Sequence, residues 1–453
     1  MFKNFKISFK RPSVRVITLA VLTFLILFGT HFHFLSLFAF VISSVIMIVS
    51  NSQYKIMVLV YLMMMAHIFK VSPSGKSYFT FLVLIYIFLE IAKKKKIMWS
   101  AMAFMAFVLS MQIIFNRISV ADDLKLFVNV LFISCALNEV ANFSSKERDK
   151  IYLSYIVSLI VSSTMRFFDS GFFNISEYTL VLKTEAFGAK LEGITRFSGL
   201  YQDPNYYTVN IILALCFVVI LYYKRSIPAI LCASFTGVII YFGSLTYSKS
   251  FILFLIFPFT LLVFANHKLN RKGAQFFIIG ILLGGITFLI VSNSHFIQMM
   301  QLRMDTGTSL TTGRSDIWEM YIDYIIDNPA IAIFGKGIGA PLMDNKAMHN
   351  TYVECFYHLG VVGTGLLVFV IAQSGVKIKK RIKRNYLNYA PLLVVLVTYS
   401  GLSQLHDYEF PFHFLLAYMA LYLWDSNEIL ESKTQIICPL LLPDILDEKI
   451  KVL

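Results

Sequence analysis

Long blocks of apolar residues without a single charge restrict this chain more than any other feature of its sequence. Residues 205–223 and 226–243 are two examples. About 20 such residues in a helix cross the hydrocarbon core of a bilayer, and backbone groups in that core must find their hydrogen-bond partners inside the protein. With 57% hydrophobic and 15% charged residues, the chain is predicted to be an all-α polytopic membrane protein.

Hydropathy predicts about fourteen transmembrane helices, within a range of about 12–14. Several of these spans are short or are separated by few residues, so their boundaries are approximate. The predicted spans cover residues 16–31, 34–50, 54–69, 77–92, 97–115, 123–139, 151–168, 205–223, 226–243, 249–266, 273–292, 350–373, 387–404 and 410–425.

The positions of lysine and arginine predict the orientation of these helices. With the N-terminus in the cytoplasm, the basic clusters at 93–96 and 377–384 and most other Lys and Arg residues fall on the cytoplasmic side, as the positive-inside rule requires. Both termini are then cytoplasmic. A net charge of +14 would suggest nucleic-acid binding in a soluble protein, but here it sets orientation in the lipid bilayer, and no nucleic-acid partner is expected.

This orientation places two long segments outside the cytoplasm. Such loops often carry function, because a rigid scaffold holds them while leaving them free to vary. The predicted organisation is an N-terminal transmembrane bundle (1–168), a first outer loop (169–204), central transmembrane helices (205–292), a second outer loop (293–349), C-terminal transmembrane helices (350–426) and a cytoplasmic tail (427–453).

The second outer loop contains a predicted amphipathic helix from Arg314 to Asn328, which Pro329 ends. We expect this helix to lie on the outer membrane surface, with its acidic face toward solvent. Its apolar face consists of Ile317, Met320, Tyr321, Tyr324 and Ile325, and its acidic face of Asp316, Glu319, Asp323 and Asp327.

Four polar motifs lie at the outer ends of the predicted spans. Arginine offers a planar fork that binds phosphate through two parallel hydrogen bonds, and histidine is the side chain whose ordinary pKa suits a general base near neutral pH. Carboxylates beside them could orient the base or bind sugar hydroxyls. Together they indicate a phosphate-bearing lipid substrate and an acceptor hydroxyl. The motifs contain Arg196 with Asp203 and Asn205, Lys249 between two serines, Arg314 with Asp316, and His349 with Asn350 and Glu354.

Each motif also has an ordinary structural explanation. Outer Arg and Lys side chains often only reach toward lipid headgroups. His349 can hydrogen-bond to the backbone at a helix start, and Asp203-Pro204-Asn205 is typical of a helix start. Gly360 and Gly363 can simply allow close helix packing. The prediction of a site therefore depends on the motifs lying together.

Three other patterns are weaker. The segment 335–339 resembles a phosphate-binding loop but lacks the strand and the Lys-Ser/Thr pair, so a flexible loop is the better interpretation. Asp122-Asp123 resembles the acidic pair of metal-dependent lipid-linked glycosyltransferases, but Asp is also a good helix cap at such a position. The five cysteines fit a helix core, and no cluster has metal-ligand spacing, so neither a metal nor a cofactor is predicted.

The order of the four motifs resembles the superfamily of O-antigen ligases and Wzy-type polymerases of bacterial polysaccharide assembly. His349-Asn350, followed by Gly360 and Gly363, fits the family signature His-[Asn/Ser/Gln]-x9-Gly-x2-[Gly/Thr/Tyr]. The stretch 313–318 and the motif at 196–205 resemble two further family segments. Lys249 stands where many members have arginine, which leaves the role of that position open.

This resemblance implies a GT-C-like, metal-independent glycosyltransferase of the bacterial inner membrane, with its active face in the periplasm. Its substrates would be undecaprenyl-diphosphate-linked glycans, and a chain-length regulator protein is a candidate partner. In the family, two loop arginines are thought to hold the diphosphate, and the motif histidine lies at the catalytic centre. The corresponding residues here are Arg196, Arg314 and His349.

Three functions stay open at this point. A polymerase passes a growing glycan to the next lipid-linked repeat unit, whereas a ligase passes the finished glycan to lipid A–core. We favour the polymerase, because about fourteen spans with an outer loop on each side of the central helices fit its layout slightly better. A lipid-linked glycan flippase would predict ionisable residues near the bilayer midplane and internal repeats, and the sequence shows neither.

Overall fold

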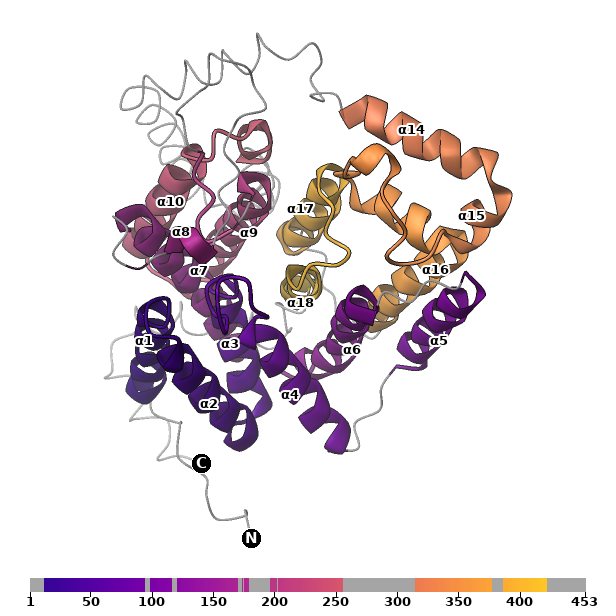
Figure 1. The fold of residues 1–453 in the computed structure, drawn as a ribbon. Helices are drawn as coiled ribbons and strands as arrows, with labels where there is room; N and C mark the ends of the chain where they lie inside the picture. Colours follow the sequence, from indigo (N-terminus) through magenta and orange to yellow (C-terminus); the bar gives the residue numbers. More distant parts are fainter. Residues whose placement is uncertain are drawn as a thin grey trace, which may run out of the picture.

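The computed structural model describes residues 12–93, 98–115, 120–169, 173, 175–178, 196–201, 203–255, 314–376 and 386–421. Every element named within these ranges is a helix, as predicted (Figure 1). In the first half these are α1 (Pro12–Phe28), α2 (His33–Val49), α3 (Ser52–Met63), α4 (Tyr78–Ala92), α5 (Trp99–Ile114), α6 (Val120–Val140), α7 (Ser145–Phe168), α8 (Ile175–Tyr178), α9 (Pro204–Tyr223) and α10 (Ala229–Ser244). The second half contains α14 (Arg314–Asp327), α15 (Pro329–Phe334), η2 (Met343–Asn345), α16 (Thr351–Val376), η3 (Tyr386–Tyr389), α17 (Ala390–Thr398), η4 (Tyr399–Gly401) and α18 (Glu409–Leu421).

The predicted spans correspond to these helices with small shifts at their ends. The span predicted at 34–50 is α2, and the spans predicted at 205–223 and 350–373 are α9 and α16. The span predicted at 387–404 is divided into η3, α17 and η4. The span predicted at 273–292, most of the span predicted at 249–266 and the tail at 427–453 lie outside the described residues.

Several helices have the length and composition of membrane spans. Within the described ranges, three are both long and apolar enough to cross a bilayer, namely Ser145–Phe168, Pro204–Tyr223 and Thr351–Gln373, and several shorter apolar helices accompany them. Large apolar side chains on the outer helices are well exposed; Phe88, Ile113 and Ile230 each exceed 70%. A surface of this kind needs an apolar solvent, and a bilayer supplies one.

The interior of the helix assembly is formed by α9 and α18. Nearly every residue of α9 is buried, and so is every residue of α18. α17 packs against both of these helices, and α18 also packs against α6 (Figure 1). Other helices therefore separate α9 and α18 from the surroundings of the protein.

Local sequence signals explain where two of the long helices begin. Ser144 and Glu147 form a reciprocal capping box at the start of α7, with the Ser144 hydroxyl accepting from the Glu147 backbone N–H. At the start of α9, the Asp203 carboxylate accepts from the Asn205 backbone N–H at 2.6 Å, and Pro204 occupies the first turn. The expected turn at 203–205 is therefore also a helix cap.

The amphipathic helix forms where the sequence predicts it, but its apolar face contacts protein. Tyr321 is fully buried, and it packs with Met348, Val353 and Tyr357 beside the start of α16. The Tyr321 hydroxyl donates to the Lys346 carbonyl at 2.9 Å. Part of the apolar face thus packs against protein, and the position of the helix on the membrane surface stays a prediction. All four acidic residues of the other face are exposed, as predicted.

Candidate functional site

The start of α9 brings together the first two polar motifs. Arg196 donates through Nε to the Thr246 carbonyl at 2.9 Å, and its Nη2 lies 3.5 Å from Asn205 Oδ1. The Ser248 hydroxyl donates to the same Asn205 oxygen at 3.1 Å. Lys249 follows Ser248 directly and is half-buried. Asn205 thus joins the arginine motif to the Ser-Lys-Ser motif.

Arg314 and His349 approach the same helix start from the second outer loop. Arg314 begins α14, and its Nη1 donates to the Gly401 carbonyl at 2.9 Å. This bond uses one of the five N–H donors of a guanidinium. The charges of Arg314 and Asp203 attract each other, and both also act on His349. Residues 203–205 of the first motif therefore interact with the other three motifs, the last of which lies more than 140 positions away in the sequence.

The environment of His349 favours its neutral form. Burial lowers the pKa of His349 below its ordinary value, the Arg314 charge lowers it further, and the Asp203 carboxylate opposes both. A neutral imidazole can accept a proton, so the ring is ready to act as a base near neutral pH. The backbone of His349 is also unusual, with a φ of 48° that few non-glycine residues adopt. Such conformations cost about 1–3 kcal/mol and are common at functional sites.

The remaining predicted site residues have different surroundings. Asn350 caps α16, because its Oδ1 accepts from the Tyr352 and Val353 backbone N–H groups at 2.9 and 3.2 Å. Asp316 is exposed on the outer face of α14 and accepts from the Ser315 hydroxyl. Glu354 lies one turn into α16, where one carboxylate oxygen accepts from the Leu405 backbone N–H at 3.4 Å.

Gly360, the first of the two motif glycines, lies at a break in α16. Gly360 has a φ of 63° inside the helix, and a Cβ there would lie 2.4 Å from both the Gly335 nitrogen and the Ile333 oxygen. At this break, Lys336 and Gly337 donate their backbone N–H groups to the Tyr357 and His358 carbonyls at 2.7 and 3.1 Å. The helix break makes these two carbonyls available as acceptors, and backbone N–H groups of the 335–339 loop donate to them.

This docking gives the 335–339 loop a structural role in place of the expected flexible one. Its glycines allow a close approach to α16, and a Cβ at Gly335 would lie 2.3 Å from the His358 oxygen. Asp123 supports the same loop from α6: its carboxylate accepts from Gln112 at 2.8 Å, and Gln112 also donates to the Ile338 carbonyl at 3.0 Å. The cap predicted at Asp122-Asp123 is not tested, because residues 116–119 lie outside the described residues.

Sequence reasoning missed the connection between η4 and α18. This segment, residues 402–408, lies against the site: its Ser403 carbonyl accepts from the Tyr206 hydroxyl at 2.6 Å, and its Leu402 carbonyl accepts from the Thr351 hydroxyl at 2.5 Å. It also carries His406 and Asp407. A His-Asp-Tyr-Glu run between two apolar helices, on the outer side of the predicted topology, was the available signal.

Comparison with known families supports the resemblance seen in the sequence. Residues 244–368 match the model of the family described as O-antigen ligase. The match includes Lys249, Arg314 and His349, and the Arg196 motif precedes it. Neither the curated proteins nor the solved structures give a match to the chain.

Proposed function

We propose that this membrane protein is a glycosyltransferase that moves a glycan from undecaprenyl diphosphate to an acceptor hydroxyl. The observation that supports this function best is the meeting of three distant motifs at the start of α9. Asp203 acts electrostatically on both Arg314 and His349, and it lies two residues from the Asn205 amide that contacts Arg196. The family match of residues 244–368 agrees with transfer of a lipid-linked glycan.

The two arginines would hold the diphosphate of the donor. Arg314 has donors beyond its bond to Gly401, and a guanidinium matches phosphate oxygens in two parallel hydrogen bonds. As the bond between the anomeric carbon and the diphosphate breaks, negative charge grows on the leaving oxygen. Cations held in place before that moment stabilise the transition state, by about 3–4 kcal/mol per donor at comparable sites. Because the arginines supply this charge, the transfer needs no metal ion.

His349 would be the general base. It takes the proton from the acceptor hydroxyl while that oxygen bonds to the anomeric carbon and the diphosphate leaves from the opposite side. A single displacement of this kind inverts the anomeric configuration. The lowered pKa of His349 agrees with this role, since the ring is neutral when the acceptor arrives. Lys249, half-buried beside Ser248, is a further candidate for contact with the substrate phosphates.

We propose further that the protein is a polymerase of lipid-linked repeat units, with about fourteen spans, a GT-C-like arrangement, both termini in the cytoplasm and the site in the periplasm. The distribution of basic residues and the layout of the outer loops support this choice. The ligase that uses lipid A–core as acceptor is the second candidate, and the description of the matching family favours it.

Glycan analysis of a deletion strain tests the function and separates the two candidates. Loss of a polymerase leaves a single repeat unit on the acceptor, whereas loss of a ligase leaves no repeat unit at all. Complementation with wild type should restore the normal chain lengths, and complementation with His349→Ala should not, at equal membrane levels of the two proteins. Normal glycans in the deletion strain, or full complementation by His349→Ala, would overturn the proposal.

A further inference from the structure

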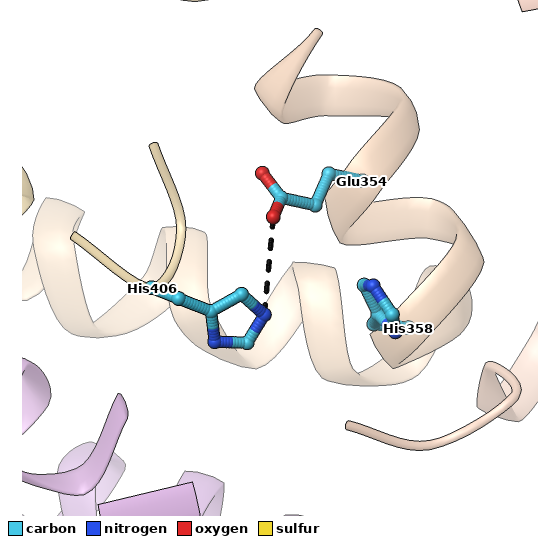
Figure 2. A group of neighbouring side chains, drawn as sticks. All are labelled: Glu354, His358 and His406. Carbon is cyan, nitrogen blue, oxygen red and sulfur yellow. Dashed lines mark ion pairs between the residues drawn. The ribbon is translucent and has the colours of Figure 1, made fainter. Parts of the chain in front are cut away.

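A cluster of one carboxylate and two imidazoles lies beside the transfer site. Glu354 and His358 are one turn apart on α16, so they share a helix face, and His406 reaches them from the 402–408 segment (Figure 2). One ligand atom from each residue lies within 4.8 Å of the other two, and His406 Nε2 is 3.8 Å from Glu354 Oε1. Glu354 and His358 are buried, and His406 is partly exposed.

We propose that Glu354, His358 and His406 bind one divalent transition-metal ion, with zinc as the best fit. Two imidazoles and one carboxylate are a recurrent zinc set, whereas magnesium and calcium prefer oxygen ligands. Bonds of about 2.0–2.1 Å at tetrahedral angles place ligand atoms roughly 3.3 Å apart. The Glu354–His406 pair, at 3.8 Å, is close to that separation, and the partly exposed His406 is the ligand that would have to move closer on binding.

The surroundings of His358 prepare it as a ligand. Its Nδ1 lies 2.9 Å from the Gly337 carbonyl oxygen, which can only accept, so Nδ1 carries the hydrogen. The lone pair of the neutral ring is then on Nε2. Metal-binding histidines almost always donate their other N–H in this way, which fixes both the tautomer and the ring orientation.

Charge and access also suit a cation. A second carboxylate, that of the half-buried Asp407, is close enough to Glu354 to interact with it electrostatically. Lys125 is the cation that acts on Asp407. His406 and Asp407 both line a pocket of about 180 Å³, together with Lys125 and Asn129, so one ligand of the cluster borders a cavity.

The ion would have a structural role, distinct from the transfer step. It would fasten the 402–408 segment to α16 next to the docked 335–339 loop. Gly401, whose carbonyl holds Arg314, directly precedes this segment. The ion would thereby keep the Arg314 side chain in place, and this inference does not require the proposed function to be correct.

Zinc titration of the purified, tag-free protein in detergent tests the site. After removal of metals with a chelator, wild type should bind one zinc per chain in competition with a chromogenic chelator, and millimolar magnesium should not displace it. His406→Ala and Glu354→Gln should each weaken zinc binding at least tenfold. His349→Ala should bind zinc as wild type does, even where it abolishes glycan transfer, which separates this site from the proposed catalytic one.

A stability measurement provides a second readout. His31, which is exposed in the connection between α1 and α2, provides a control histidine. Zinc should raise the melting temperature of wild type and of His31→Ala, and it should leave that of His406→Ala unchanged. His406 is partly exposed, so its replacement should leave the fold intact, as size-exclusion chromatography of the variant can verify. Absence of stoichiometric zinc in wild type, or equal zinc affinity in wild type and His406→Ala, would overturn the proposal.

Discussion

Arg314 and His349 interact electrostatically beside the start of α16, and the charge of Arg314 adds to burial in holding the pKa of His349 below its ordinary value. The two residues belong to different motifs, 35 positions apart in the sequence. Arg314 would therefore have two effects on one reaction: it would bind the donor diphosphate, and it would keep the base neutral.

The first prediction concerns the pH dependence of glycan transfer. A base must be neutral to accept a proton, so the rate should fall as the pH falls through the pKa of His349. Arg314→Gln removes a cation that lowers this pKa, so the acidic limb of the pH–rate profile should move to higher pH. Asp203→Asn removes the opposing anion, so the limb should move to lower pH, and asparagine still caps α9. Identical acidic limbs in all three proteins would exclude His349 as the base.

The second prediction concerns the paired N–H donors of the Arg314 guanidinium. Arg314→Lys keeps the charge and loses the paired donors, so we expect the transfer rate to fall by roughly tenfold to a hundredfold, less than the roughly hundredfold to thousandfold seen when a transition-state donor is removed outright. The measurement is the rate with a synthetic lipid-linked donor, and glycan chain lengths in a complemented deletion strain report the same loss.

Arg225→Lys is the matched control for this substitution. Arg225 is exposed in the short connection between α9 and α10, on the predicted cytoplasmic side, so its replacement should leave the rate unchanged. Equal rates for Arg314→Lys and wild type would contradict a diphosphate clamp at this position.

The sequence was sufficient to predict where the main described helices form and which face of α14 is apolar. Apolar blocks and helical periodicity are local properties, so they report where a helix forms and which of its faces is apolar. They do not report what covers that face, so the packing of Tyr321 against Tyr357 could not be predicted. The close contact between Gly335 and Gly360 could not be predicted for the same reason, since the two residues are far apart in the sequence.

The polar core was also beyond sequence reasoning. Asn210 is fully buried in the apolar α9, and its Oδ1 accepts from the Tyr155 hydroxyl at 2.7 Å and lies 3.1 Å from His413 Nε2. The Tyr399 hydroxyl lies 3.0 Å from the other nitrogen of His413. A lone asparagine within a predicted span gives no sign of such partners, because they come from α7, η4 and α18.

The third prediction follows from this network. Asn210→Ala removes a partner of three buried polar side chains, those of Tyr155, His413 and Glu409, and we expect a loss of about 1–3 kcal/mol in stability, with a lower melting temperature in detergent. Thr208→Val in the same helix is the control, because the Thr208 hydroxyl bonds only to the Pro204 carbonyl of its own helix among the described contacts. Equal melting temperatures for the two variants would show that the network adds little stability.

The last prediction compares three glycines of α16. Gly360 combines a φ of 63° with a backbone contact that leaves no space for a Cβ, so Gly360→Ala should destabilise the protein by at least about 2 kcal/mol and reduce the yield of folded protein. At Gly363 a Cβ would lie 2.5 Å from Cε1 of Phe107, a side chain that can move, so Gly363→Ala should have a smaller effect.

At Gly365 no atom lies within 4 Å of an added Cβ, so Gly365→Ala should leave stability unchanged or raise it by up to about 1 kcal/mol. Fluorescence-detected size-exclusion chromatography and thermal melting in detergent measure all three variants. The expected order of stability is Gly365→Ala above Gly363→Ala above Gly360→Ala. If Gly360→Ala were as stable as Gly365→Ala, the break in α16 would not depend on glycine, and the family signature would need a catalytic explanation at this position in place of the structural one.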